Sequence, residues 1–188
     1  MRNEQEWEQK IRKQFIEENF TPRLQKDLIR ITPPNLPQEI ESLYIFGETD
    51  SGKTVLAAFL MLQELKTMYL TQSRQEESDK CVFISTPELI FNIRNSLGKS
   101  TVTELEVLNY YSNLHLLVLD DFGVVKSSDW VIQDLYLIIN NRYENLKKTI
   151  FTSNLSLEEL AVSLGDDRIP ARIRRMGKVF RKGSYLQS

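Results

Sequence analysis

Eight consecutive residues have the types and spacing of a phosphate-binding loop. They match the pattern G-x-x-x-x-G-K-T and are Gly47, Glu48, Thr49, Asp50, Ser51, Gly52, Lys53 and Thr54. In such a loop, successive backbone N–H groups and a helix N-terminus form a concave anion site. The Lys53 ammonium would reach the β- and γ-phosphates, and the Thr54 hydroxyl would ligate magnesium. The pattern therefore predicts that ATP and magnesium bind at residues 47–54.

Asp50 departs from the commonest form of this loop, because many such loops have another glycine there. A carboxylate near phosphates is a mild electrostatic cost unless it points outward. Aspartate nevertheless tolerates a positive φ better than most residues. The alternative is an ordinary glycine turn that binds nothing. The apolar strand pattern before the loop and the helical pattern after it argue against that alternative.

A second candidate is a pair of carboxylates that ends an apolar run. Asp120 and Asp121 follow the four apolar residues 116–119. Charges at the carboxyl end of a buried parallel strand belong in a ligand crevice. In a P-loop protein, Asp120 would hold magnesium through water and Asp121 would polarise the water that attacks the γ-phosphate. Taken alone, the pair fits a solvated turn equally well.

Asn154 ends another apolar run, residues 149–153, and is a weaker candidate. From a neighbouring strand it would orient the attacking water. It could equally be a turn residue that leads into a helix. Ser156 would cap that helix, with Glu159 as its capping-box partner.

A cluster of arginines follows Gly165, which is predicted to end that helix. Arg168 and Arg172 are four residues apart and share a helical face. Either would act as an arginine finger that completes a neighbouring subunit's ATP site. For Arg174 and Arg175, a solvated basic surface is the favoured interpretation.

The segments that must position these residues alternate between short apolar runs and longer helical patterns. The predicted strands are residues 43–46, 81–85, 116–119 and 149–153. The predicted helices are residues 53–70, two helices between 87 and 111, and residues 128–143. This alternation predicts a mostly parallel sheet covered on both faces by helices, which is a three-layer α/β P-loop NTPase fold.

Short helices are also predicted before the first strand. Apolar residues lie on one side of a 3.6-residue period at Trp7, Ile11, Phe15, Ile16 and Phe20. Such a helix must pack on something. The proline-rich segment 33–37 is the predicted boundary. It separates N-terminal helices and a linker at residues 1–37 from an ATPase domain at residues 38–188.

Composition limits the possible function classes. The chain has 24 basic and 26 acidic residues, so nucleic-acid binding would need a local basic face. The single cysteine, Cys81, excludes an internal disulfide framework and favours a cytoplasmic protein. His115 is the only histidine, and no second histidine or cysteine supports a metal site with it. No apolar run is long enough to cross a bilayer, so no membrane partner is expected.

Taken in order, these segments resemble the DnaC/IstB-like group of AAA+ ATPases. This group includes replicative-helicase loaders and transposition helper ATPases. The resemblance covers about residues 43–185. The residues that carry it are 83–89, 117–123, 130–143, 152–156 and 164–173. So many matches in the same order argue against chance.

The resemblance implies ATP binding at residues 47–54 and magnesium and hydrolysis functions at Asp120 and Asp121. It also implies a sensing residue at Asn154 and a trans-acting arginine at Arg172 or Arg168. Members of the group assemble into rings or spirals. For a loader, the implied partners are a replicative helicase and single-stranded DNA, with DNA contacts on the helices between residues 87 and 111.

Two departures from the group narrow the prediction. Only 34 residues follow Asn154, so no full C-terminal helical lid is expected. Short helices also stand where loaders commonly carry a separate helicase-binding domain. We predict a DnaC-like helicase loader that hydrolyses ATP and uses it to control assembly in DNA replication. The alternatives are an IstB-like transposition helper that binds duplex DNA, and a nucleotide-dependent binding module without significant hydrolysis.

Overall fold

The computed structural model describes residues 3–71, 80–96, 103–123 and 129–183. Within these residues the chain forms a five-stranded parallel sheet with the order β2-β3-β4-β1-β5. The strands are β1 (Leu43–Phe46), β2 (Cys81–Ser85), β3 (Leu116–Asp120), β4 (Lys148–Ser153) and β5 (Lys178–Arg181). The first four agree with the predicted strands to within one residue at each end. Strand β5 was not predicted.

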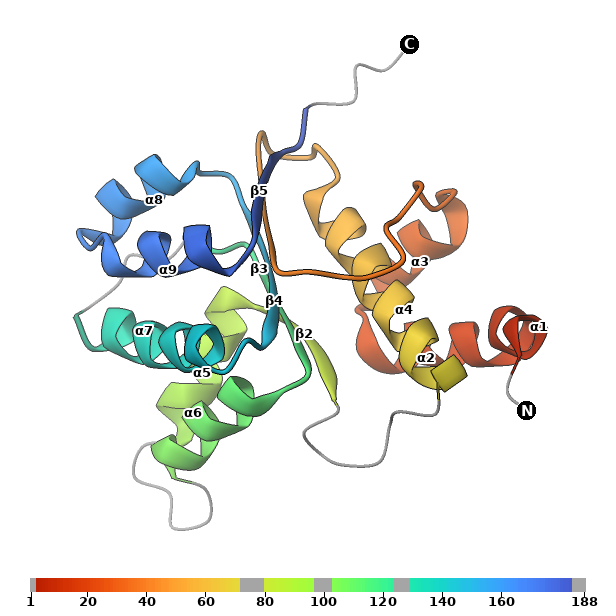
Figure 1. The fold of residues 1–188 in the computed structure, drawn as a ribbon, viewed down its shortest axis with the longest axis horizontal. Helices are drawn as coiled ribbons and strands as arrows, with labels where there is room; N and C mark the ends of the chain where they lie inside the picture. The colour runs from red at the N-terminus through yellow and green to blue at the C-terminus, as the bar shows by residue number, and fades with distance from the viewer. Residues whose placement is uncertain (1–2, 72–79, 97–102, 124–128, 184–188) are drawn as a thin grey trace.

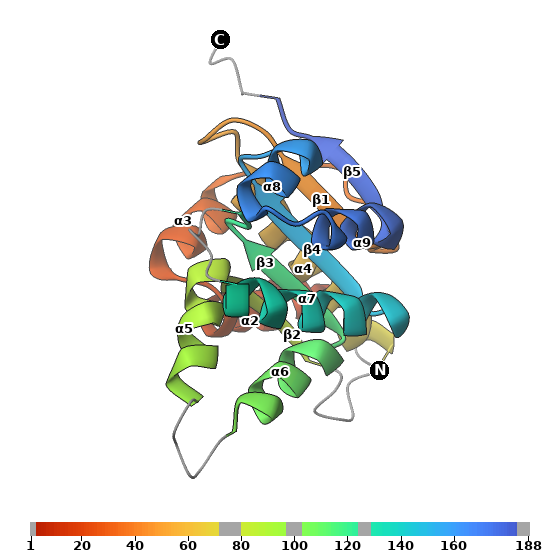
Figure 2. The ribbon, with the colours of Figure 1, turned by 90° about the vertical axis from the view of Figure 1, so that its left-hand side faces the viewer.

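Helices cover both faces of this sheet. The N-terminal helical segments are α1 (Glu4–Glu6), the π-helical turn η1 (Trp7–Ile11), α2 (Arg12–Asn19) and α3 (Pro22–Arg30). The others are α4 (Lys53–Thr71), α5 (Thr86–Ser96), α6 (Glu104–Asn113), α7 (Asp129–Glu144), α8 (Leu157–Leu164) and α9 (Arg168–Met176). Helix α4 and the N-terminal helices lie on one face, here called the α4 face, and α5 to α9 lie on the other, the α7 face (Figures 1 and 2). The predicted three-layer α/β architecture is confirmed.

Strand β5 could not be predicted from hydrophobic patterns because it has no buried apolar run. All four of its residues are exposed. It pairs in parallel with β1, from Leu43 opposite Lys178 to Phe46 opposite Arg181. A Cβ atom at Gly177 would lie 1.8 Å from the carbonyl oxygen of Ser42, so glycine is needed where the chain meets β1. The strand therefore depends on a close backbone approach, which a hydrophobic pattern does not reveal.

The N-terminal helices pack on the α4 face, as their amphipathic pattern requires. Trp7 is 2% exposed, and its ring lies 5.4 Å from that of Phe15 and 5.7 Å from that of Tyr69 in α4. Phe20 meets Phe83 of β2 edge-on at 5.4 Å. Offset and edge-to-face aromatic pairs of this kind add to the burial energy. These helices thus share a hydrophobic core with α4 and the sheet.

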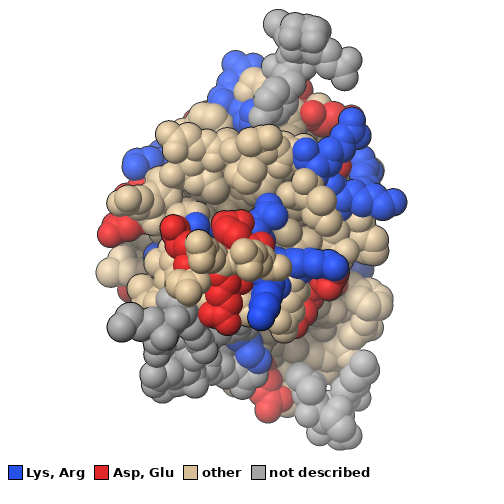
Figure 3. Space-filling model, turned by 90° about the vertical axis from the view of Figure 1, so that its right-hand side faces the viewer, with Lys and Arg blue, Asp and Glu red and all other residues tan. Residues whose placement is uncertain are grey.

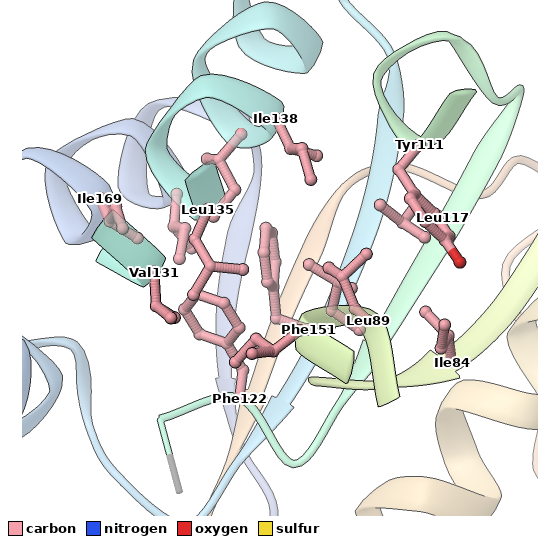
Figure 4. Packing of buried hydrophobic residues seen from close by; sticks show 14 of the residues in the cluster. Ile84, Leu89, Tyr111, Leu117, Phe122, Val131, Leu135, Ile138, Phe151 and Ile169 are labelled. Carbon is pink, nitrogen blue, oxygen red and sulfur yellow. The ribbon is translucent and has the colours of Figure 1, made fainter. Parts of the chain in front are cut away.

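A second core fills the space between the sheet and the α7 face. Phe122, just after β3, meets Phe151 of β4 edge-on at 5.3 Å. Leu135 and Ile138 of α7 point toward these rings from above (Figure 4). Helix α7 therefore buries its apolar side against the sheet.

Helix α8 begins and ends at the predicted residues. Ser156 accepts a hydrogen bond from the Glu159 N–H at 3.2 Å, and the Glu159 carboxylate accepts one from the Ser156 N–H at 2.7 Å. This is the predicted capping box. Gly165 ends the helix with a left-handed φ of 63°. The stop at Gly165 lets α9 begin at Arg168 and carry the arginine cluster.

Candidate nucleotide site

The loop between β1 and α4 has the curved backbone path of a phosphate-binding loop. Gly47, Asp50 and Gly52 have positive φ angles of 148°, 59° and 84°. The Ser51 N–H donates to the Glu48 carbonyl at 3.3 Å and closes a turn inside the loop. Asp50 adopts the left-handed conformation that aspartate tolerates better than most residues. The departure from glycine at Asp50 therefore leaves the path of the loop intact.

Lys53 lies at the base of this loop with its ammonium over the loop carbonyls. The Nζ atom donates to the carbonyl oxygens of Gly47 at 3.0 Å and Glu48 at 2.6 Å. The residue is 6% exposed. Burial lowers the pKa of Lys53, and the nearby carboxylates of Asp121 and Asp120 oppose that shift. The loop thus holds a buried cation where a phosphate chain would need one.

Asp120 ends β3 and is held by hydroxyl groups from three other elements. The Thr54 Oγ1 of α4 donates to its carboxylate at 2.9 Å, and the Thr152 Oγ1 of β4 donates at 2.5 Å. The Thr86 Oγ1 of α5 donates to its carbonyl oxygen at 3.0 Å. Burial raises the pKa of Asp120, although the hydrogen bonds from Thr152 and Thr54 oppose it. Sequence reasoning missed Thr152 and Thr86, whose only signal was a polar residue at a predicted strand end.

Thr54 and Asp120 form an oxygen pair that suits magnesium. Magnesium binds proteins through one or two carboxylates, with waters and substrate phosphates as its other ligands. In the described residues, no group of three His, Cys, Asp or Glu side chains could hold a metal ion alone. A magnesium ion here would therefore depend on a bound nucleotide for the rest of its ligands.

Asp121 and Asn154 follow two neighbouring strands and face the same space. Asp121 has a left-handed φ of 55°, and its N–H donates to the Thr152 Oγ1 at 3.0 Å. Asn154 comes directly after β4, which lies between β3 and β1 in the sheet. Both residues line one cavity together with Lys53. The shared Thr152 hydroxyl fixes the two aspartates relative to each other.

This cavity has a volume of about 1280 Å³, which exceeds the roughly 300–1,000 Å³ of most small-molecule sites. Its wall includes most of the phosphate-binding loop and the carboxyl ends of β3 and β4. Residues between Asn19 and Asn35 supply the wall on the N-terminal side, and Phe180 and Lys182 supply it at β5. The N-terminal helices therefore belong to the wall of the site as well as to the core.

The arginines of α9 do not line this cavity. Arg168 binds the Asp166 carboxylate at 2.6 Å and lies over the Tyr136 ring. Arg172 donates from Nε to the Asn140 side chain at 2.8 Å and lies over the ring of Tyr143. Both belong to the α7 face, across the sheet from α4. The structure thus places them apart from the cavity of their own chain.

Arg174 and Arg175 are both exposed, as the interpretation of a solvated surface predicts. Arg174 forms an ion pair with Glu158 of α8 at 2.5 Å. Exposed pairs of this kind contribute little to stability, about 0–1 kcal/mol. We therefore assign no function to these two residues.

The parallel sheet and the loop before α4 define a P-loop NTPase domain of the AAA+ type. The family described as IstB-like ATP binding protein matches residues 16–175. The chain therefore belongs to this ATP-binding family, and the predicted resemblance to the DnaC/IstB-like group is confirmed.

Two curated relatives are helicase loaders. The replicative helicase loader DnaI of Bacillus subtilis (strain 168) is 30% identical over 121 residues, which are 64% of this chain and 35% of the relative. The replicative helicase loader DnaC of Escherichia coli (strain K12) is 25% identical over 135 residues, which are 72% of this chain and 51% of the relative. The chain thus matches between about a third and a half of these relatives' lengths.

Solved structures share this fold. The crystal structure of the DnaC helicase loader has 29% identity and a TM-score of 0.61, and the match covers 86% of each chain. AMPPCP-bound DnaA from Aquifex aeolicus has 19% identity and a TM-score of 0.61, over 89% of this chain and 49% of that one. At that identity, the likeness to DnaA shows a shared fold. Among the helices of the described residues, none is long and apolar enough to span a membrane.

Proposed function

We propose that this protein is a DnaC-like helicase loader that hydrolyses ATP to ADP and phosphate and acts in DNA replication. ATP would control its assembly on a replicative helicase and single-stranded DNA. The observation that carries the proposal is the convergence of Lys53, Asp120, Asp121 and Asn154 on one cavity. The similarity to two helicase loaders supports the choice of process.

Each of these residues has a chemical task in the proposed reaction. Lys53 would turn from the loop carbonyls to the β- and γ-phosphates. Thr54 and Asp120 would hold magnesium, which neutralises charge on the phosphates. Asp121 is exposed and next to the buried Asp120, so it would accept a hydrogen bond from the attacking water. Asn154 would orient the same water from the end of β4.

A trans-acting arginine fits the arrangement of α9. Arg172 and Arg168 lie on the α7 face, so they would reach the γ-phosphate of a neighbouring subunit rather than their own. An arginine finger supplied in trans stabilises the charge of the transition state and changes turnover by about 10³–10⁵-fold. Hydrolysis would therefore require a ring or spiral of subunits.

Single-stranded DNA would bind the α7 face near α5 and α6. Phe91 is 62% exposed on α5, and the Arg94 guanidinium lies over the Trp130 ring at 5.0 Å. Exposed aromatic and arginine side chains are platforms on which unpaired bases stack. On the α4 face, acidic and basic side chains lie side by side (Figure 3). Residues 97–102, within the predicted DNA-contacting segment, lie outside the described residues.

The test is ATP turnover measured against protein concentration, with and without single-stranded DNA. Wild type is compared with Arg172→Ala and with Arg174→Ala, a control on the same helix whose side chain pairs with Glu158. We expect turnover that rises with concentration, is lost in Arg172→Ala and is kept in Arg174→Ala. Normal turnover in Arg172→Ala would exclude that residue as the finger. ATP binding without turnover, even with DNA and helicase present, would favour the nucleotide-dependent binding module.

A transposition helper is the second candidate, because the family match is to IstB-like proteins. Such a helper would bind duplex DNA and a transposase. The Asp121→Asn variant is designed to trap ATP and so stabilise the assembled state. Pull-downs with this variant, using a helicase in one arm and a transposase with duplex DNA in the other, separate the two functions. Retention of the transposase alone would replace the loader proposal.

A further inference from the structure

Strand β5 and the residue directly after it each add one residue to the wall of the nucleotide cavity. They are Phe180 and Lys182, which are two positions apart. Side chains alternate between the faces of a strand, so residues two apart share a face. Val179 and Arg181 occupy the other positions and do not line the cavity. The last described strand therefore presents an aromatic ring, and the residue after it a cation, to the space beside the phosphate-binding loop.

Backbone contacts fix Lys182 beside that loop. Its N–H donates to the Phe46 carbonyl at 2.7 Å, directly before Gly47. A Cβ atom at Gly47 would lie 2.2 Å from the Lys182 carbonyl oxygen, so the two backbones touch. Any residue larger than glycine at position 47 would push β5 away. The start of the loop and Lys182 are therefore one packed unit.

The lining of the cavity has more acidic than basic side chains, and the phosphate-binding loop supplies only one of the basic ones, Lys53. Among the described lining residues, the acidic ones are Asp27, Asp50, Glu88, Asp120 and Asp121, and the basic ones are Arg23, Lys53 and Lys182. A polyphosphate ligand adds further negative charge to a wall that already has more acids than bases. Arg23 belongs to α3, whereas Lys182 is in backbone contact with the loop. Lys182 is therefore the better-placed second cation.

The ring of Phe180 has a different use. It is 43% exposed although it lines the cavity, and Ile31, another lining residue, is 42% exposed. A ring exposed at the edge of a ligand cavity offers a flat apolar surface on which a nucleobase can stack. Phe180 is in the strand and Lys182 follows the strand two residues later, so the two side chains would meet different parts of one nucleotide.

We propose that Lys182 contacts the phosphate chain and Phe180 the base of the nucleotide held at the phosphate-binding loop. This inference rests on the proposed function, since it assumes that residues 47–54 bind ATP. Strand β5 would then complete the nucleotide site on the side away from β4. Neither residue was singled out from the sequence, because neither belongs to a phosphate-binding motif.

The test is calorimetric binding of the whole chain to magnesium ATP and to magnesium tripolyphosphate, which lacks a base. Lys182→Gln should weaken both ligands about tenfold, because it removes one charged hydrogen-bond donor. Phe180→Ala should weaken ATP about tenfold and leave tripolyphosphate unchanged. Lys182→Arg should keep most of the affinity, and the matched controls Arg181→Gln and Val179→Ala should bind as wild type does. Thermal unfolding checks that every variant is folded.

Affinity equal to wild type in Lys182→Gln or in Phe180→Ala would overturn the assignment of that residue. An equal loss in Lys182→Gln and Arg181→Gln would also overturn the assignment, because it would reflect general charge. The Lys53→Ala variant separates this inference from the proposed function. If Lys53→Ala loses ATP binding while Lys182→Gln and Phe180→Ala keep it, only the assignment of Lys182 and Phe180 fails. If Lys53→Ala binds ATP normally, the nucleotide site itself is wrong and this inference falls with it.

Discussion

The two ends of the parallel sheet both bury charged side chains, and they do so in different ways. At the carboxyl end, where β1, β3 and β4 finish, Lys53 and Asp120 line a large cavity. At the amino end, where β3 and β4 begin, Arg142 and Glu64 are 0% and 4% exposed and are surrounded by protein. One end keeps its charges available to a ligand, and the other uses them to join elements.

Arg142 is the clearest example of a buried charge at the amino end that is surrounded by protein partners. Its guanidinium makes five hydrogen bonds within the described residues, including those to the carbonyl oxygens of Tyr111, Leu114 and Lys148. Burial lowers the pKa of Arg142 to about 9, which leaves it a cation at neutral pH. The residue ties the end of α6 to the start of β4. Its charge is therefore structural.

Glu64 of α4 is the acidic counterpart at the amino end. Burial raises the pKa of its carboxyl, but hydrogen bonds from His115 at 2.5 Å and Lys148 at 2.7 Å outweigh burial and hold the pKa below its usual value. His115 is thus a hydrogen-bond partner of a buried carboxylate. Perturbed pKa values occur at both ends of the sheet, so a shifted pKa alone does not mark a site. An open cavity beside the charge is the distinguishing feature.

The largest expected effect tests the structural end. Arg142→Ala would leave several carbonyl oxygens buried without a donor, and each such group costs about 1–3 kcal/mol. We expect the free energy of unfolding to fall by about 4 kcal/mol in urea titrations. Arg142→Lys, which keeps the charge but not the forked geometry, should recover only part of this. A loss below about 1 kcal/mol would show that the buried charge of Arg142 does not stabilise the amino end of the sheet.

The next effect tests the ligand end. Lys53→Ala should weaken ATP binding at least about a hundredfold, which is about 3 kcal/mol, because a charge-assisted contact to phosphate is lost. Calorimetry measures this loss. Stability without ATP should change by less than about 1 kcal/mol, because burial already works against this cation. A large stability loss with intact ATP affinity would make Lys53 a structural residue like Arg142.

A buried carboxyl without a full set of partners gives a third test. Asp134 of α7 is 5% exposed, and its Oδ2 is without a hydrogen-bond partner among the described residues. Burial, together with the nearby Glu104 carboxylate, raises the pKa of Asp134 to about 6. The folded state therefore binds more protons than the unfolded state between pH 3.8 and about 6, so stability falls as the pH rises through this window.

Replacing Asp134 by a neutral isostere should remove this pH dependence. Asp134→Asn should be more stable than wild type by about 2 kcal/mol at pH 8, and the difference should vanish below about pH 4. Urea titrations at a series of pH values measure it. Glu104→Gln removes the neighbouring negative charge and should lower the pKa of Asp134. The fall in stability with rising pH should then end at a lower pH than in wild type. A pH-independent difference would mean that the variant acts through packing.

The smallest effect concerns a partly exposed member of the amino-end network. The Lys148 side chain is 36% exposed, so water screens its contact with Glu64. Lys148→Met should cost about 1 kcal/mol of stability and leave ATP affinity unchanged. A double-mutant cycle with Glu64→Gln isolates the pair. Weaker ATP binding in Lys148→Met would contradict this expectation, because it would show that the amino end of the sheet affects the nucleotide cavity at the carboxyl end.

The sequence predicted the parts of the fold that local patterns encode. Apolar runs located β1 to β4, and the capping box at Ser156 and the stop at Gly165 located α8. Strand β5 was missed because its residues are exposed and its pairing depends on the contact of Gly177 with Ser42. Thr152 and Arg142 were missed as positioning residues, because their hydrogen-bond partners are 28 to 32 residues away or in other elements.

By itself, the sequence determined the phosphate-binding loop, the aspartates that end β3 and the three-layer fold. Motif spacing and hydrophobic periodicity are local properties, so these features could be read along the chain. Only the tertiary structure decided which buried charges face a cavity and which are enclosed by protein. It also brought β5 beside Gly47 and placed the α9 arginines across the sheet from α4. These outcomes depend on contacts between distant segments, which local spacing does not specify.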